Sequence, residues 1–348
     1  MGLLIKLLSQ CVSPFKDETL SSWLYRISLQ RKVIDINRVI ILPKVKILWD
    51  GPVPHSIDFD FDFSSDFAKN ALLITGLSSK VITKTFAPQT HKLVSWARRT
   101  LFCKSCLSAD IASGQLPGWR KSWCYRESVH CVYHREELVS LEQAPTISKS
   151  WDAFVQNVHA MHPRPTINVE RLSLLCFNLS HRISKRKKEC SLTELELFAK
   201  LFDVFLMART FRSRAGVAHY TFGSRSVPFL ERVTSYADSI KYGAEVSGAR
   251  AKYGSLFMVA YLMDLLTDRE IDTIANVAGV VNISFPSSES IIPTIYFGCC
   301  DVSDYEYLHG FLGGFKRIPG SKIDILFARL ERDVGQRIFC RDFKFGSR

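Results

Sequence analysis

Four residues between positions 103 and 134 constrain this chain more than any other feature of its sequence. Cys103 and Cys106 are separated by two residues, and Cys131 and His134 repeat that spacing after an interval of 24 residues. A two-residue spacer lets a tight turn direct both side chains at one ion, and Zn²⁺ takes four such ligands in a tetrahedron. A closed Cys3His set leaves no position for water, so the pattern predicts one structural zinc ion and not a hydrolytic centre. Cys124 lies inside the same window and is an alternative ligand.

The composition indicates a globular chain with an excess of positive charge. The 348 residues are 47% apolar and 23% charged, which argues against disorder, and the length predicts two or three subdomains. The formal net charge of +12 suits a polyanionic partner such as nucleic acid, although a merely basic soluble protein carries the same excess. Ten cysteines without a secretory signal predict reduced thiols in a cytoplasm, and no apolar segment approaches the roughly 20 residues of a membrane-spanning helix.

Hydrophobic periodicity predicts a mainly α fold around a small zinc-finger module. The predicted parts are an N-terminal helical domain over 1–100, the zinc-finger module over 101–142, a linker over 143–168 and a mainly helical C-terminal domain over 169–348. One or two short helices are expected over 66–86, and a short helix within the linker. In the C-terminal domain, capping boxes at 191–194 and 267–270 predict two helix starts, and the last third has room for one small sheet.

Two apolar runs near the N-terminus resemble a helix-turn-helix. In the first, Asp17 is expected to cap a helix. The apolar stripe of that helix is formed by Leu20, Trp23, Leu24 and Ile27. The second run covers residues 34–42, and the pair is either a DNA-binding motif or an ordinary helical hairpin.

Residues 57–63 alternate between apolar and acidic side chains. Asp58, Asp60 and Asp62 would share one face of a strand or extended loop. A calcium-binding EF-hand loop is excluded, because its required glycine and glutamate are replaced by Phe63 and Lys69. The segment therefore predicts a solvated acidic face above a row of phenylalanines.

Two groups of residues are candidates for contact with nucleic acid or a protein partner. Trp119 and Arg120 lie in the metal window beside Trp123, where the aromatic rings either stack on bases or, as we favour, pack over the zinc loops. The second group is the densest basic run of the chain, made of Arg182, Lys185, Arg186, Lys187 and Lys188. These cations either neutralise phosphates or form a solvated helix end that suits the negative end of the helix dipole.

The sequence nominates no catalytic site. A phosphate-binding loop, a metalloprotease motif, a nucleophile elbow and a paired-carboxylate signature are all absent from the sequence. The chain is therefore predicted to be a binding or adaptor protein and not an enzyme. A nuclease or recombinase would need metal-binding carboxylates that no motif identifies.

Two stretches together resemble the TniQ/TnsD family, whose members select target sites for transposons. The first, Pro14 to Arg26, is similar to that family's opening helix. The second begins at Phe102 and continues through the cysteine pair, the two tryptophans and the Cys-x-x-His to Leu138, in the order of the family's zinc module. The likeness covers residues 13 to about 140, and the further cysteine-rich finger of larger relatives has no counterpart, since residues 140–175 contain no cysteine.

The resemblance implies a non-catalytic adaptor in a bacterial cytoplasm. Shorter TniQ members act as homodimers and link an RNA-guided Cascade complex to an AAA+ regulator of transposition, so that the guide RNA reads the sequence. Longer TnsD-like members bind an attachment-site DNA directly. The length of the chain and its single finger favour the Cascade-bound branch; a TnsD-like protein and a stand-alone zinc-containing DNA-binding protein are the alternatives.

Overall fold

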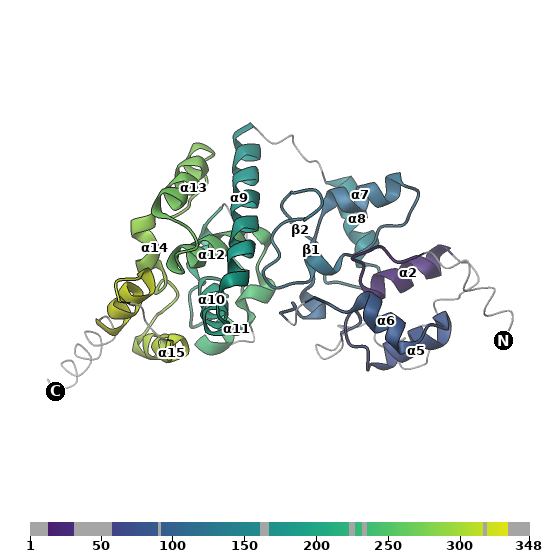
Figure 1. Cartoon of the computed structure of the whole chain (residues 1–348), viewed down its shortest axis with the longest axis horizontal. Helices are drawn as coiled ribbons and strands as arrows, with labels where there is room; N and C mark the ends of the chain where they lie inside the picture. The colour runs from purple at the N-terminus through teal and green to yellow at the C-terminus, as the bar shows by residue number, and fades with distance from the viewer. Residues whose placement is uncertain are drawn as a thin grey trace. The chain divides into compact units, whose positions relative to one another are not determined.

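The computed structural model describes residues 13–30, 58–89, 92–160, 167–222, 227–231, 235–315 and 319–332 (Figure 1). Helices dominate the described structure, as the sequence predicts. The chain divides into two compact units, residues 1–163 and residues 164–348, so the metal window shares a unit with the N-terminal helices. In the described ranges, no helix is both long enough and apolar enough to cross a membrane.

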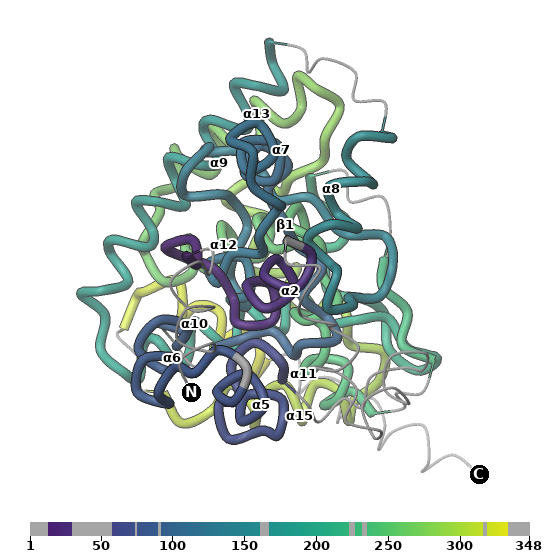
Figure 2. Tube along the Cα trace, turned by 90° about the vertical axis from the view of Figure 1, so that its right-hand side faces the viewer, coloured from purple at the N-terminus to yellow at the C-terminus, as the bar shows by residue number. Residues whose placement is uncertain are grey.

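The first unit combines short helices with a two-stranded sheet. Its elements are α2 (Leu20–Gln30), α5 (Asp66–Thr75), α6 (Ser79–Phe86), η1 (Trp96–Arg98), β1 (Leu101–Phe102), α7 (Lys104–Ala112), η2 (Lys121–Trp123), β2 (Val139–Ser140) and α8 (Lys149–His159). The strands β1 and β2 are antiparallel, with Leu101 opposite Ser140. In Figure 1 and in Figure 2, α2 lies between α7 and the pair formed by α5 and α6.

The apolar stripe of α2 is buried as predicted. It packs against Ala68 and Ala71 of α5 and against Ile82 and Phe86 of α6. The two short helices predicted over 66–86 are present, and each begins at a serine whose side chain accepts a hydrogen bond from the first turn. A serine cap and an apolar face thus give short helices a defined start and a surface to bury.

Two details of the N-terminal prediction are wrong. Asp17 does not cap α2, because the helix begins at Leu20 and the Asp17 carboxylate accepts a hydrogen bond from the backbone N–H of Ser122 (3.1 Å). Residues 58–62 form turns and not an extended acidic face, and Asp60 is fully buried. Both acids bind partners that are distant in sequence, which local patterns do not reveal.

The predicted linker is partly structured. The short helix expected within it is α8, which packs against α7 and buries Lys149, Ser150 and Ala153. Residues 143–160 therefore belong to the first unit and not to a bare connection. The apolar run at 34–42, and with it the helix-turn-helix, lies outside the described residues.

The second unit is built around one buried helix. Its elements are α9 (Ile167–Arg186), η3 (Lys187–Glu189), α10 (Leu192–Phe205), η4 (Val217–Tyr220), α11 (Tyr236–Val246), α12 (Ala249–Leu262), α13 (Asp268–Val280), α14 (Ser288–Thr294), α15 (Val302–Leu312) and a helical segment over 322–332. In α12, every residue except Arg250 is buried, and the helix contacts α9, α10, α13, α14 and η4. A Cβ atom at Gly243 of α11 would lie 2.1 Å from the carbonyl oxygen of Leu206, so glycine permits the close approach to the end of α10.

Both capping boxes in this unit are confirmed. Ser191 and Glu194 cap α10 reciprocally, and Thr267 and Glu270 do the same for α13. Within the described part of the last third of the chain there is no strand, and the small sheet expected there lies in the first unit instead.

Candidate metal centre and its surroundings

The first pair of predicted ligands is placed by the start of α7. Cys103 follows β1 directly and is the N-cap residue of the helix, while Cys106 lies in its first turn. The Cys103 Sγ accepts a hydrogen bond from the Cys106 N–H at 3.3 Å. A helix start therefore directs both sulfur atoms to the same side.

The second pair lies in a tight turn that precedes β2. Arg135 has a φ of 56°, in the left-handed region, and its N–H donates to the carbonyl of Cys131 at 2.9 Å. The Cys131 N–H in turn donates to the carbonyl of Glu136 at 2.8 Å. Because β2 pairs with β1, the sheet holds this turn beside Cys103.

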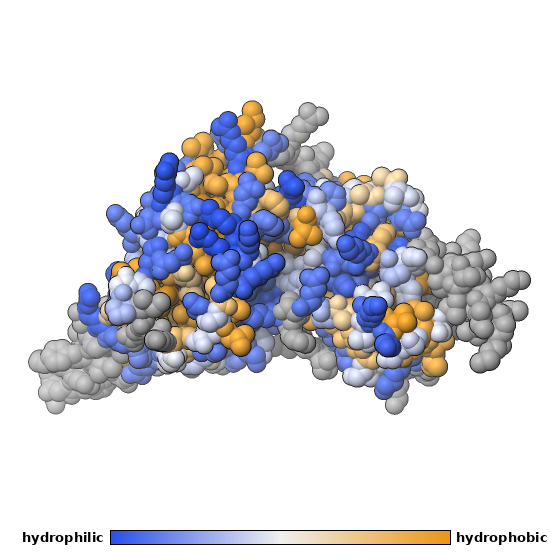
Figure 3. Space-filling view, in the orientation of Figure 1, coloured by the Kyte–Doolittle hydropathy of each residue, from blue (hydrophilic) through white to orange (hydrophobic). Residues whose placement is uncertain are grey.

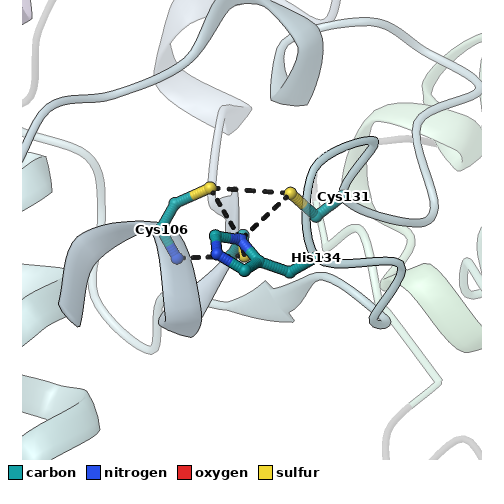
Figure 4. A group of neighbouring side chains, drawn as sticks. Cys106, Cys131 and His134 are labelled. Atoms are coloured by element: carbon teal, nitrogen blue, oxygen red, sulfur yellow. Dashed lines mark hydrogen bonds between the residues drawn. The ribbon is translucent and has the colours of Figure 1, made fainter. Parts of the chain in front are cut away.

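The four ligand atoms have the spacing of a tetrahedral metal site, and Figure 4 shows three of the residues, Cys106, Cys131 and His134, pointing toward one another. The Nδ1 atom of His134 lies 3.5, 3.2 and 3.8 Å from the sulfur atoms of Cys103, Cys106 and Cys131, and the last two sulfurs are 3.5 Å apart. Tetrahedral bonds of about 2.3 Å to sulfur and about 2.0 Å to nitrogen would place ligand atoms about 3.5–3.8 Å from one another. All four atoms lie within 4.8 Å of one another, so the group can hold one metal ion.

Crowding of the three sulfur atoms separates the pKa values of the thiols. A hydrogen bond with Cys103 holds the pKa of Cys131 far below its usual value. Hydrogen bonds with Cys106 and Cys131 raise the pKa of Cys103. The pKa of Cys106 is about 12, because a hydrogen bond with Cys103, which lowers it, is outweighed by the bond with Cys131 and by burial. One thiolate shares protons with its neighbours here, and a cation that binds all three sulfurs displaces such protons.

Glu136 lies beside the first ligand and was not found from the sequence. Its Oε1 atom accepts a hydrogen bond from the Cys103 thiol (2.9 Å) and from the Ser105 N–H (3.1 Å), while Oε2 accepts from the Ser105 hydroxyl (2.9 Å). The bonds to Ser105 hold Glu136 at the start of α7, whereas its bond to Cys103 needs the thiol proton that a bound metal displaces. The only sequence signal was an acid two residues beyond His134, a position where acids are common for other reasons.

Cys124 is not part of the cluster. It is fully buried, and its thiol donates to the backbone carbonyl of Arg120 at 3.5 Å. Burial raises the pKa of this thiol to about 12, which keeps it protonated. The structure therefore selects Cys103, Cys106, Cys131 and His134 as the ligand set.

Trp119 and Trp123 are core side chains of the first unit, and the Trp119 ring lies 6.1 Å from the ring of Phe102, which precedes the first ligand. Both rings are buried and meet edge to face with centroids 5.5 Å apart. Arg120 is 7% exposed, and its guanidinium pairs with the Asp110 carboxylate at 2.5 Å. Trp119 therefore presents no ring face to a nucleic-acid base, and Arg120 is not placed to contact phosphate.

The N-terminal helix is bonded directly to the loop that carries these tryptophans. The Thr19 N–H donates to the carbonyl of Trp119 (3.0 Å), and the Trp119 N–H donates to the Ser22 hydroxyl (2.7 Å). The Lys121 N–H donates to the carbonyl of Asp17 at 2.6 Å. Residues 17–22 and 119–121, about a hundred residues apart in the sequence, are thus held together by hydrogen bonds.

A buried ion pair completes this junction. Glu18 and Arg26 are both fully buried, with 2.7 Å between the charged atoms. The Glu18 carboxylate also accepts hydrogen bonds from the Ser22 hydroxyl (2.9 Å) and from the Phe15 N–H (3.0 Å). The guanidinium groups of Arg26 and Arg120 lie over the Phe15 ring, at 3.9 and 4.1 Å from its centroid.

The basic run lies at the end of α9 and is only partly free. Arg182 forms an ion pair with Glu270, the capping-box glutamate of α13. Arg186 donates a hydrogen bond to the carbonyl of Leu265, between α12 and α13 (2.7 Å). Lys187 lies 3.9 Å from the centre of the Phe198 ring of α10. Lys185 and Lys188 are exposed. In Figure 3, hydrophilic residues gather over the part of the surface that α9 crosses.

Fold and site together define a mainly helical protein whose first unit contains one Cys3His group able to hold a metal ion. No protein-family model, no curated protein and no solved structure matches the chain.

Proposed function

We propose that this chain is a non-catalytic adaptor for target-site selection in DNA transposition, of the TniQ/TnsD kind, with one structural Zn²⁺ in its first unit. The observation that supports this most is the direct bonding between the two stretches that carry the resemblance. The helix at 20–30 and the metal window at 101–142 share backbone hydrogen bonds and buried side chains, so they form a single platform.

A platform of this kind suits an adaptor because its surface is fixed by interior contacts. The zinc ion joins the start of α7 to the turn before β2, and the loop between them is held to α2. Structural zinc contributes directly to the folding of small modules, which have too little core to fold unaided. The adaptor works as a homodimer that links a Cascade complex with its guide RNA to an AAA+ regulator, and base pairing supplies the sequence reading.

The test is to isolate the tagged full chain from the cells that produce it, at moderate salt. Proteins that co-elute are identified by mass spectrometry, and nucleic acid in the same peak is sequenced. We expect Cascade subunits, a guide RNA and an AAA+ protein. Recovery of the chain without any of these partners would contradict the proposal. A Cys103→Ser variant serves as control, because loss of the platform should remove the partners as well.

Direct DNA binding is the second candidate, and two observations favour it. The chain has a net charge of +12, and Lys185 and Lys188 at the end of α9 are exposed. A TnsD-like protein or a stand-alone DNA-binding protein would protect one DNA sequence in a footprint, with an affinity that falls steeply as salt rises. That result without any Cascade subunit would replace the first proposal by this one.

A further inference from the structure

An exposed turn after α10 displays an aromatic ring among arginines. Phe211 is 75% exposed, the highest value for any aromatic side chain in the described ranges. It meets Phe229 edge to face, with centroids 4.9 Å apart and planes at 85°. Phe229 is itself 41% exposed, so the pair presents aromatic surface to solvent and does not close a core.

The turn that carries this ring is fixed by hydrogen bonds. The Thr210 N–H donates to the carbonyl of Ser213 (3.0 Å), and the buried Thr210 hydroxyl accepts from the N–H groups of Arg212 (3.2 Å) and Ser213 (3.0 Å). The Arg209 N–H donates to the carbonyl of Pro228 (3.0 Å). Phe211 is therefore carried by a backbone turn that is already fixed, and little backbone freedom is left to lose on binding.

Three arginines belong to the same turn. Arg209, Arg212 and Arg214 are all exposed, and Arg209 lies over the Phe229 ring at 5.9 Å from its centroid. Among the described residues, no carboxylate forms an ion pair with any of the three, and Glu231 is the only acid in the segments 209–214 and 227–231. Their charges are available to an anionic partner.

We propose that this turn, Arg209 to Arg214 with Phe229, binds single-stranded nucleic acid. The Phe211 ring stacks on an unpaired base, and the arginines contact the neighbouring phosphates. Stacking platforms flanked by cations are how proteins bind single strands without reading their sequence, because every base has a π-face. A duplex keeps its bases stacked on one another and offers the ring nothing equivalent. Two exposed rings among three cations also provide too little apolar area for insertion into a lipid surface.

This site lies in the second unit and uses none of the metal ligands, so it goes beyond the proposed function. The probe is a fluorescein-labelled 20-nucleotide strand of mixed sequence, as DNA and as RNA, titrated with the full chain and followed by anisotropy. Phe211→Ala is expected to weaken binding of the strand by about 5- to 150-fold, the range given by one stacked base. Arg212→Ala is expected to weaken binding and to lower the slope of log K against log salt by about 0.7.

Two matched controls lie elsewhere in the same unit. Leu192→Ala removes an apolar side chain that is 87% exposed, and Arg329→Ala removes an exposed cation. Both are expected to bind the strand within twofold of the unchanged chain. Circular dichroism melting verifies that each variant is folded, which is expected because the altered side chains are exposed.

Three results would overturn the inference. In the first, Phe211→Ala binds the DNA strand and the RNA strand as tightly as the unchanged chain does. In the second, a duplex of the same sequence binds as tightly as the single strand, and Phe211→Ala weakens both equally. In the third, Phe211→Ala weakens binding of the chain to anionic lipid vesicles but not to the strands, which would identify a membrane surface. Strand binding that depends on Phe211 in a chain that recovers no Cascade subunit would reject the adaptor proposal and leave this one standing.

Discussion

At Asp60, three parts of the first unit meet on a single carboxylate. The side chain is fully buried and accepts hydrogen bonds from Lys149 (2.8 Å), Arg99 (2.8 Å) and Ser21. Burial alone would raise the pKa of this acid, but the charges of Lys149 and Arg99 hold it well below the usual range. Removal of the negative charge would leave the buried Lys149 ammonium without its ion pair and Arg99 with Asp58 alone, which is far more costly than loss of an exposed pair.

We therefore expect Asp60→Asn to lower the free energy of unfolding by about 3–5 kcal/mol. The measurement is urea denaturation followed by tryptophan fluorescence, which reports on the first unit through Trp96, Trp119 and Trp123. Asp62→Asn is the matched control, because Asp62 is only partly buried and its carboxylate bonds only to Ser64 and Ser65 in its own turn. Its effect should stay within about 0.5 kcal/mol. Equal effects of the two substitutions would contradict this account of Asp60.

His219 makes the second unit sensitive to acid. It is 1% exposed, its Nε2 donates to the carbonyl of Leu206 at 2.9 Å, and burial lowers its pKa below 6.5. The imidazole is therefore neutral in the folded chain at a pH where the unfolded chain is already protonated. Stability is fully present above about pH 6.5 and is lost as the pH falls from there toward the folded pKa, at no more than about 1.4 kcal/mol per pH unit.

We expect the free energy of unfolding of the second unit to fall between pH 7 and pH 5, and to fall less in a His219→Gln variant. The comparison is the difference between the two pH values within each protein, so a constant cost of the substitution cancels. Amide hydrogen exchange in α10 and α12 gives the measurement for this unit alone. Identical pH dependence in both proteins would show that another group is responsible.

The residues that matter most in these predictions were the hardest to see in the sequence. The alternation at 57–63 indicates a strand with a solvated acidic face, yet Asp60 binds cations 39 and 89 residues away. Cys103 and His134 were found because metal ligands have a fixed local spacing. Arg120 was taken for a surface cation because the buried carboxylate that pairs with it is ten residues away, with no pattern between them.

At the scale of elements, the start of a helix is determined by residues within its first turn, so one substitution there can test it. The Ser191 hydroxyl accepts a hydrogen bond from the Glu194 N–H, and the Glu194 carboxylate accepts one from the Ser191 N–H (2.7 Å). Ser191→Ala is expected to lower the free energy of unfolding of the second unit by about 1 kcal/mol. Urea midpoints compare it with Ser287→Ala at the start of α14, where the serine side chain makes no capping bond. Equal effects of the two substitutions would contradict the role given to the capping box.

The elements themselves were predicted best where their signals are local. Both capping boxes gave correct starts for α10 and α13, and the apolar stripe gave the buried face of α2. The start of α2 was misplaced because the Asp17 carboxylate is engaged by Ser122, a partner more than a hundred residues away. The small sheet was expected in the wrong third of the chain, since strands of two residues carry no measurable periodicity.

At the scale of the molecule, a continuous series of contacts runs through the first unit from the Cys3His group to α2, α5 and α6. The Cys3His group brings the start of α7 next to the turn before β2, the loop between them is bonded to α2, and α2 packs on α5 and α6. The second unit has a separate core around α12. Damage at the metal group should therefore spread through the first unit as far as α2 and stop there.

Removal of the proposed zinc tests that series of contacts in the full chain. We expect His134→Ala, or a chelator added to the unchanged chain, to release about one equivalent of metal and to deprotect amides in residues 100–140 and in α2, because structural zinc binding is coupled to folding. Amides of α12 should keep their protection. Cys300→Ser is the matched control, since Cys300 is exposed and lies outside the ligand group. Elemental analysis that finds little metal in a fully protected chain would mean that hydrogen bonds among the thiols, and not an ion, hold the platform together.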